Sequence, residues 1–137
     1  MTLILIIIAG ACNAVMDVLQ FNFDKSIFKK YNPSFWDPKK SWINKYQQPL
    51  TLYKKKWYYF GLITPKFREA FPFSTTLFVS LTDGWHLFQK ITWSCLIAAI
   101  VLYEPVNSQV IDFIVYYAVF TSSFTLWYDH LLLSGNK

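Results

Sequence analysis

Charge is scarce in this sequence, and acidic charge is the scarcer kind. Charged residues make up 15% of the 137 residues, with eight Asp and Glu against 13 Lys and Arg. Soluble domains carry about 25% charged residues. Hydrophobic residues reach 54%, so a soluble protein of this composition would have to hide its surface in an oligomer. The composition therefore favours an integral membrane protein.

Cysteine and histidine are also rare, with two residues of each. Cys12 and Cys95 both lie within apolar runs, which indicates small buried hydrophobic residues rather than a disulfide or a metal pair. The sequence contains no HExxH motif and no serine in a nucleophile elbow. These absences argue against a Ser–His–Asp hydrolase and favour a protein that is not an enzyme.

Aromatic residues, in contrast, are abundant. They make up 20% of the chain and include six Trp and nine Tyr. Trp and Tyr are typical of the two membrane–water interfaces, where their amphipathic rings lie at the level of the headgroups. The length of 137 residues suits one domain, so we expect a single all-α membrane domain over 1–137.

Three apolar segments are long enough to span a bilayer, which takes about 20 helical residues. We expect transmembrane helices over about 2–21, 84–103 and 110–131. The second helix should begin further upstream, at an N-cap formed by Ser74, so that its first turns protrude from the hydrocarbon core. The short loop at 104–108 predicts that the second and third helices pack as an antiparallel hairpin.

Positive charge is concentrated in one loop. Eleven of the 13 Lys and Arg residues lie between Lys25 and Arg68, and the loop at 104–108 carries none. By the positive-inside rule, the long loop of about 22–73 and the C-terminal Lys137 are cytoplasmic. The N-terminus is then on the outside of the membrane.

The long loop interleaves Lys with Tyr, Trp and Phe over 28–67, and its four prolines exclude long helices. Such a pattern also occurs on nucleic-acid-binding surfaces. Its position between two spans instead favours rings at the interface and amines on anionic headgroups, at about 1 kcal/mol per residue. We expect the loop to fold back as a cap over the cytoplasmic ends of the helices. The candidates for headgroup binding are Lys39, Lys40, Lys54, Lys55, Lys56 and Trp57.

Polar residues recur at spacings of three and four along one face of each expected helix. Counted inward from the outer helix ends at about 1.5 Å per residue, the ionisable ones fall in one layer near the cytoplasmic boundary. This layer is the most specific signal in the sequence. The first helix contributes Gly10, Asn13, Asp17, Gln20 and Asp24; the second contributes Asp83, His86 and Lys90; the third contributes Ser122, Thr125 and Asp129, with His130 beside them.

One interpretation of this layer is purely structural. Asp17 lies deep enough in its helix for its charge to need a partner. The simplest partners are Lys90 and His86 on the second helix, in an Asp17–Lys90 or Asp17–His86 pair. Asp129 and His130 lie so close to the end of their helix that they reach water as ordinary interfacial residues.

The other interpretation is chemical. Asp83 and His86 are neighbours on a helix, and together with Asp17 and His130 they would supply imidazole and carboxylate ligands for a divalent metal such as zinc, manganese or iron. Without a metal, His86 is a general base oriented by Asp17 or Asp83, and Lys90 with the loop lysines holds a phosphate or a lipid headgroup. The candidate catalytic residues are Asp17, Asp83, His86 and Lys90.

Two stretches carry a resemblance to other sequences, "NPSFWDPKKSWINKY" (32–46) and "STTLFVSLTDGWHLFQK" (74–90). They resemble small multi-spanning membrane proteins of bacteria, in which an NPxFWDPxxSWxNKY loop precedes an STTxFVxxTDGWHLF helix. The likeness, with the general layout, covers about half of the chain. It implies a protein of the bacterial cytoplasmic membrane in which loop and helix form one unit, and it implies no catalytic role.

Three helices bury little surface, so we expect a homo-oligomer or a subunit of a larger membrane complex. The favoured function is a scaffold or accessory subunit with membrane lipid bound at anionic headgroups. The runner-up is an intramembrane enzyme, with or without a divalent metal, that acts on a lipid or lipid-linked substrate at the inner leaflet. Proton or ion conduction is the third possibility, although Asp112 is the one acidic residue in the outer halves of the helices.

Overall fold

Residues 1–48, 50, 52–53 and 66–133 are described by the computed structural model of the chain. This part of the chain is all-α, apart from two short strands that pair antiparallel with Leu52 opposite Phe67. The short η elements are 3-10 helices, except η5, which is π-helical. In chain order the elements are α1 (Thr2–Phe21), η1 (Phe23–Lys25), η2 (Ile27–Lys30), α2 (Pro33–Trp36), α3 (Pro38–Ser41), η3 (Trp42–Lys45), β1 (Leu52–Tyr53), β2 (Lys66–Phe67), η4 (Val79–Leu81), α4 (Gly84–Val101), α5 (Gln109–Thr125) and η5 (Leu126–Leu132).

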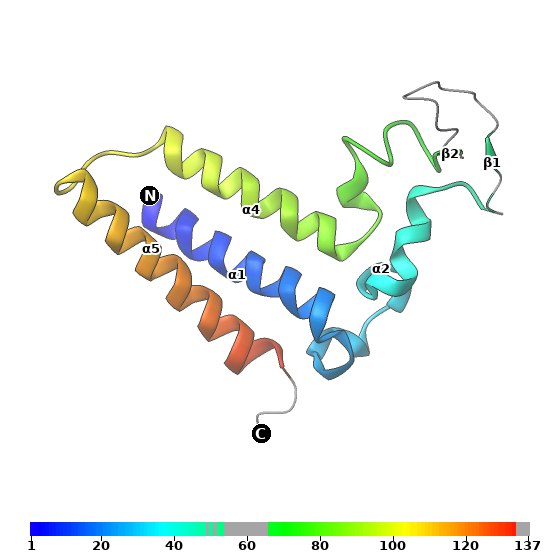
Figure 1. Cartoon of the computed structure of the whole chain (residues 1–137), viewed down its shortest axis with the longest axis horizontal. Helices are drawn as coiled ribbons and strands as arrows, with labels where there is room; N and C mark the ends of the chain where they lie inside the picture. The colour runs from blue at the N-terminus through cyan, green and yellow to red at the C-terminus, as the bar shows by residue number, and fades with distance from the viewer. Residues whose placement is uncertain (49, 51, 54–65, 134–137) are drawn as a thin grey trace, which may run out of the picture.

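The three long helices lie side by side in one layer, with α1 in the middle (Figure 1). Along its length α1 packs against α4 on one side and against α5 on the other. Within the described residues α4 and α5 make few direct contacts with each other. The second and third helices are joined by a short turn and run antiparallel, as predicted, but they do not pack against each other as a hairpin, because the first helix separates them.

Gly10 explains how α1 fits so closely against α5. A Cβ atom at this position would lie 2.6 Å from the backbone oxygen of Phe120 and 3.0 Å from the Cβ atom of Ser123. Glycine therefore lets the two backbones approach as no other residue would. The hydroxyl of Ser123 also donates a hydrogen bond to the backbone oxygen of Ile7, at 2.8 Å. These contacts place α1 beside α5 and leave α4 on its other side.

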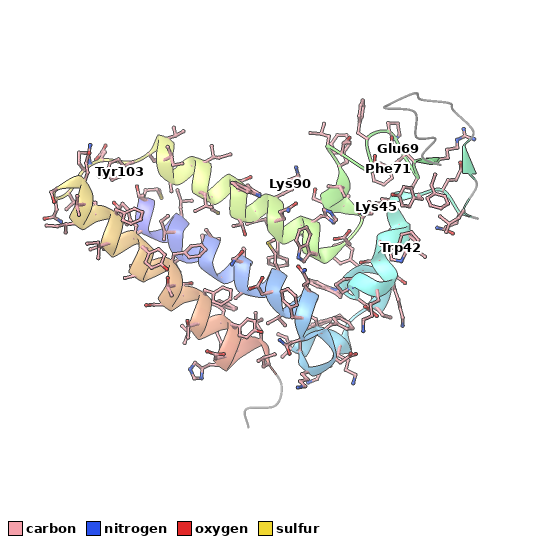
Figure 2. All side chains as sticks on the ribbon, in the orientation of Figure 1. Trp42, Lys45, Glu69, Phe71, Lys90 and Tyr103 are labelled. Carbon is pink, nitrogen blue, oxygen red and sulfur yellow. The ribbon has the colours of Figure 1, made fainter. Side chains whose placement is uncertain are left out.

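The loop at 104–108 is closed by Asp112 in the first turn of α5. Its carboxylate accepts hydrogen bonds from the hydroxyl of Tyr103 at 2.8 Å and from the backbone N–H groups of Val106 and Asn107 at 3.0 and 3.1 Å. Asp112 is buried by these contacts, and its role is structural. We call this end of the layer, where Tyr103 lies in Figure 2, the turn end.

Two of the three predicted spans are confirmed as long apolar helices. α1 has the predicted bounds, and α5 with η5 covers the predicted third helix. By length and composition alone, both could cross a membrane, and α4, with 18 residues, is not among these candidates. In the apolar window of the α5–η5 helix 11% of the residues are buried, against 44% in α1. Asp24 falls beyond the end of α1, in η1, and so is not on its polar face.

α4 begins at Gly84 and not, as predicted, just after Ser74. Phe73 has a φ angle of 63°, and residues 72–78 form turns instead of the first turns of a helix. The hydroxyl of Ser74 donates to the backbone oxygen of Lys45 at 2.7 Å instead of capping a helix. The chain then follows turns and η4 until Asp83, which is the N-cap of α4.

The residues between the long helices, 22–48 and 66–83, form what we call the cap. Trp36 stacks on Phe28 with ring centroids 4.7 Å apart and contacts Phe88 of α4 at 6.2 Å. Phe28 belongs to a buried cluster that includes Val18 and Leu19 of α1. The first part of the aromatic loop therefore packs on the ends of α1 and α4, while 49, 51 and 54–65 of the predicted cap lie outside the described residues. This end of the layer is the cap end.

Two segments of the cap that are distant in sequence are joined by Asn44. Its side-chain amide donates to the backbone oxygen of Ser34 at 2.5 Å and to that of Thr82 at 2.8 Å. Ser34 lies in the first of the two stretches that carry the resemblance, and Thr82 lies in the second. These contacts join the two stretches within the cap.

Candidate functional site

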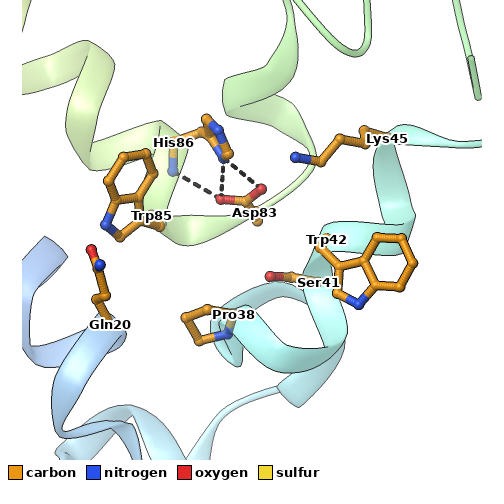
Figure 3. Close-up of a pocket in the computed structure, with 8 residues that line it drawn as sticks. All are labelled: Gln20, Pro38, Ser41, Trp42, Lys45, Asp83, Trp85 and His86. Atoms are coloured by element: carbon orange, nitrogen blue, oxygen red, sulfur yellow. Dashed lines mark hydrogen bonds and ion pairs between the residues drawn. The ribbon is translucent and has the colours of Figure 1, made fainter. Parts of the chain in front are cut away.

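One pocket of about 280 Å³ lies where the cap meets the ends of α1 and α4 (Figure 3). The cap supplies its floor from α3 and η3, and the start of α4 supplies one wall. Two of the four candidate catalytic residues line it. The lining residues are Gln20, Pro38, Ser41, Trp42, Lys45, Asp83, Trp85 and His86.

Asp83 and His86 are paired because they occupy the first turn of α4. Oδ1 of Asp83 accepts the backbone N–H of His86 at 2.8 Å, as an N-cap does with the third residue of a helix. Nδ1 of the imidazole lies 2.8 Å from Oδ1 and 2.7 Å from Oδ2. With its hydrogen on Nδ1, the imidazole donates to the carboxylate and leaves Nε2 available for another partner.

The surroundings of Asp83 favour its charged form. The residue is 3% exposed, and burial by itself would raise its pKa. The hydrogen bonds from the side chain and backbone of His86 outweigh burial, and the positive charges of His86 and Lys45 act in the same direction. The pKa of Asp83 therefore lies below its ordinary value of 3.8. The pocket contains a buried carboxylate whose oxygens are already occupied by His86.

Ser41 is a pocket residue that the sequence does not reveal. It is 2% exposed and ends α3, whose N-cap, Asp37, accepts the backbone N–H of Lys39 at 2.9 Å. Within the described residues its hydroxyl makes no hydrogen bond, and in Figure 3 it points into the pocket. The Asp37–Pro38 pair is a signal for the start of a helix. The direction of the Ser41 side chain depends on how the whole cap folds.

Ser41, His86 and Asp83 do not form a catalytic triad. In a triad the histidine holds the carboxylate on one ring nitrogen and the nucleophile on the other. In Figure 3 Asp83 lies between Ser41 and the ring of His86, and the hydrogen bonds to Asp83 use the nearer ring nitrogen, Nδ1. Nε2 therefore lies on the far side of the ring from Ser41.

The other two candidate catalytic residues, Asp17 and Lys90, are not pocket residues. Asp17 is half-buried on α1, and Lys90 is exposed on the edge of α4 that faces away from α1 (Figure 2). Neither side chain forms an ion pair or a hydrogen bond with a described residue. The predicted Asp17–Lys90 and Asp17–His86 pairs are wrong, because α4 turns Lys90 outward and Asp83 holds His86.

The residues of the hypothetical metal site are not brought together. In the described ranges no three His, Cys, Asp or Glu side chains are grouped closely enough to hold a metal ion. Asp83 and His86 bind each other. Asp17 is on α1, and His130 is exposed on η5, which packs against α1 rather than α4. The proposed ligand set of Asp17, Asp83, His86 and His130 therefore has no geometric support.

The predicted headgroup-binding residues fall into two groups. Lys39 and Lys40 are exposed on α3 in the cap, where they are accessible to a membrane surface. The remaining candidates lie outside the described residues: Lys54, Lys55, Lys56 and Trp57.

A second, almost wholly apolar pocket of about 320 Å³ lies at the turn end between α1, α4 and α5. Two of its lining residues, Thr2 and Ile6, belong to α1. At helical spacing they share a face with Asn13, Asp17 and Gln20, and Gln20 lines the pocket at the cap end. This face of α1 therefore opens into a pocket at each end.

No protein-family model, no curated protein and no solved structure matches this chain. The basis for a function is then the chemistry of the two pockets and of the helix surfaces.

Proposed function

We propose that the chain is a three-span membrane scaffold that assembles with copies of itself through α1 and α4. One observation carries the proposal: Asp17 is half-buried on α1, Lys90 is exposed on the outer edge of α4, and neither has a partner within the described part of one copy. A second copy supplies to each residue the charge that it lacks.

The outer surface of the layer supports a location in the membrane. Large apolar side chains are exposed over most of α5 and on α4, an arrangement that lipid stabilises and water does not. We take α4 as the third span, since it packs along the whole apolar helix α1. The exposed apolar side chains of α4 include Trp93, Ile97, Ile100 and Val101.

Labelling of single cysteines tests the three spans. In a Cys12→Ala, Cys95→Ala background, a cysteine at Ser108 in the turn is expected to react with a membrane-impermeant maleimide in intact cells. A cysteine at Ser34 in the cap is expected to react only after permeabilisation, because the lysine-rich side stays in the cytoplasm. If both positions react from the same side, α4 does not span the membrane.

The unpaired carboxylate of Asp17 favours the binding of a second helix to α1. A charged carboxylate in a span costs about 2.5–3.5 kcal/mol at the bilayer centre on insertion scales. Asn13 and Gln20 on the same face also lack side-chain hydrogen bonds to described residues. A helix that packs on this face of α1 and carries a basic residue at the depth of Asp17 would satisfy all three side chains.

Lys90 identifies that helix as α4 of another copy. It is the one basic residue in the expected spans, and it lies on the outer edge of the layer. The contact joins the outer edge of α4 in one copy to the Asp17 face of α1 in the next copy. These two surfaces differ from each other. Such heterologous contacts close into a ring when the rotation between copies allows it.

A charge swap tests the assembly. We expect the purified full chain in a mild detergent to be oligomeric by native mass spectrometry. Asp17→Lys and Lys90→Asp should each raise the concentration for half-dissociation by about tenfold, the effect of one interhelical polar contact. The double variant should restore association.

The matched control is Lys29→Asp, which reverses an exposed charge in the cap and should leave association unchanged. A wild-type chain that is monomeric at all concentrations would overturn the proposal. So would a double variant that associates no better than the single ones.

A second candidate function is an enzyme of the inner leaflet, favoured by the orientation of His86 by Asp83 beside an open pocket. Release of headgroups from labelled membrane lipids is the test. The activity should be present in the wild type and absent in His86→Gln, while Lys90→Gln, outside the pocket, should retain it. An activity that survives His86→Gln would exclude this role.

A further inference from the structure

The chain between β2 and α4 exposes apolar side chains outside the long helices. Residues 70–82 contain no charged side chain and pass through turns and η4. We call residues 71–81 the apolar segment. Exposed apolar side chains concentrated in this way mark a contact surface. Five large ones are exposed, with Leu77 at 64% and Leu81 at 66%: Phe71, Phe73, Leu77, Phe78 and Leu81.

The apolar segment lies at the cap end, beside the start of α4 and on the side of that helix that faces away from α1 (Figure 1). Phe71 and Lys90 both lie on this side of α4 in Figure 2. The lysine-rich cap end is the cytoplasmic end by the positive-inside rule. In the proposed membrane location, the segment is therefore at the depth where headgroups meet acyl chains.

The backbone of the apolar segment is hydrogen-bonded within the segment itself. The N–H groups of Thr76 and Phe78 donate to the carbonyl oxygen of Phe73 at 3.1 and 3.0 Å. The N–H group of Ser74 donates to the carbonyl oxygen of Phe71 at 3.1 Å. Backbone groups without a partner are costly in lipid. Turns that are closed in this way lower the cost of entering it.

Polar side chains in and beside the segment bond to the protein. Ser74 is fully buried, and its hydroxyl donates to the backbone oxygen of Lys45 at 2.7 Å. The carboxylate of Glu69 accepts the backbone N–H of Phe73 at 3.1 Å and the hydroxyl of Thr75. These bonds hold the turns in shape and leave mainly Phe and Leu side chains on the surface.

Arg68 supplies a positive charge just before the segment. It is exposed and makes no ion pair with a described residue. Apolar side chains next to a basic one are typical of segments that lie in the interface of an anionic bilayer. Another copy of the chain would present its own lysine-rich cap at this depth, which repels Arg68, whereas anionic headgroups attract it.

We propose that the apolar segment inserts into the lipid leaflet on the cap side. Leu77, Phe78 and Leu81 contact acyl chains just below the headgroups, and Arg68 faces the phosphate groups. The segment then fixes the depth of the cap in the membrane without crossing it. This inference rests on the membrane location in the proposed function, but not on the association of copies.

Quenching by spin-labelled lipids tests the depth of the segment. The full chain with Cys12→Ala and Cys95→Ala is reconstituted in vesicles of phosphatidylcholine and phosphatidylglycerol. Leu77→Cys or Leu81→Cys then carries the fluorophore NBD. We expect a blue-shifted emission and a loss of most of the fluorescence when the nitroxide is near the carboxyl end of the acyl chain. A nitroxide near the methyl end should quench little.

Two other labelled positions are the controls. Tyr117→Cys, at an exposed position of α5, should be quenched by the nitroxide near the methyl end, because it lies well inside an expected span. Ser34→Cys, at an exposed position of the cap, should be quenched by neither lipid. If Tyr117→Cys is quenched while Leu77→Cys and Leu81→Cys behave like Ser34→Cys, the inference is overturned and the membrane location stands. If Tyr117→Cys is not quenched either, the membrane location itself fails.

A second copy of the chain is the alternative occupant of this surface. Quenching of Leu77→Cys that is retained with Lys90→Asp, which separates the copies, would support the contact with lipid. Disulfide-linked dimers of unlabelled Leu77→Cys in the vesicles, together with an unquenched label at the same position, would place another copy there and overturn the insertion.

Discussion

The helical layer and the cap are built on different principles. The layer consists of three long helices whose backbone groups bond within each helix, and much of its apolar surface is exposed. The cap consists of helices of three or four residues, each too short to be stable alone. Three of them begin at a residue whose side chain accepts a backbone N–H in the next turn: Ser26, Asn32 and Asp37.

The comparison teaches where each region is sensitive to substitution. In the layer, side chains on the outer surface are interchangeable as long as they stay apolar, and the constraints lie where backbones touch. In the cap, single side chains close individual turns or join distant segments. Substitutions should therefore be costly at Gly10 in the layer and at Trp36 or Asn44 in the cap.

The largest effect is expected for Trp36→Ala. Trp36 contacts Phe28 and Phe88, so its loss removes the aromatic packing between α2 and α4. We expect a loss of about 3 kcal/mol in the free energy of unfolding in detergent, typical of a large-to-small change at an aromatic residue. Trp93→Ala, at an exposed position of α4, is the control and should cost far less. Equal losses in the free energy of unfolding for Trp36→Ala and Trp93→Ala would contradict the predicted difference between cap and layer.

Gly10→Ala should have the next largest effect. Alanine favours a helix over glycine by about 1 kcal/mol, so propensity alone predicts stabilisation. The added Cβ would meet the backbone of Phe120 at 2.6 Å, and overpacking of this kind costs about 2 kcal/mol. A lower melting temperature with unchanged helix content by circular dichroism is the expected result. A more stable Gly10→Ala would show that α1 and α5 are not held at this distance.

Asn44→Ala should have a smaller and more local effect. The amide of Asn44 joins Ser34 to Thr82, and loss of these bonds should cost about 1–2 kcal/mol. Hydrogen exchange should become faster in the cap but not in α1. Gln48→Ala is the control, since its 3.3 Å hydrogen bond to Ile43 is exposed.

The smallest effect is expected from the charge of Asp83. Its pKa is lowered in the folded chain, so its stabilisation is complete above the ordinary value of 3.8 and is lost as the pH falls through the lower folded pKa. Asp83→Asn retains the N-cap acceptor but loses the charge, at a cost of about 1 kcal/mol near neutral pH. The difference in melting temperature between the two chains should narrow below about pH 4. A constant difference would mean that the carboxylate contributes no pH-dependent stability.

The two regions also differ in how far the sequence predicts them. The bounds of α1 follow from hydropathy and helix length alone, and the packing of Phe28 and Trp36 from the start of the aromatic loop on the helix ends follows from its composition. The order of the helices in the layer does not follow, because hydropathy carries no information on neighbours. Gly10 was the available signal, and its effect depends on which backbone approaches it.

The candidate site was also predictable only in part, because spacing along a helix carries no information on tertiary contacts. Spacing predicts that Asp83 and His86 are neighbours, and they are, with Asp83 as the N-cap of α4 and His86 in its first turn. Spacing also predicts that ionisable groups lie at one depth. Groups at the same depth, however, are not necessarily close enough to pair. Asp17 and Lys90 do not pair, and the pocket is completed by Ser41, whose position depends on tertiary contacts of the cap.

The central position of α1 has a consequence for how the protein folds during its synthesis. The hydrogen bonds of α1 to α4 and α5 join Met16 to Thr92, Thr2 to Leu102 and Ile7 to Ser123, which are 76, 100 and 116 positions apart. During synthesis, α1 leaves the ribosome before any of these partners exists. We expect α1 to lack these packing partners until α5 is translated. The helix made first is then the last to be enclosed.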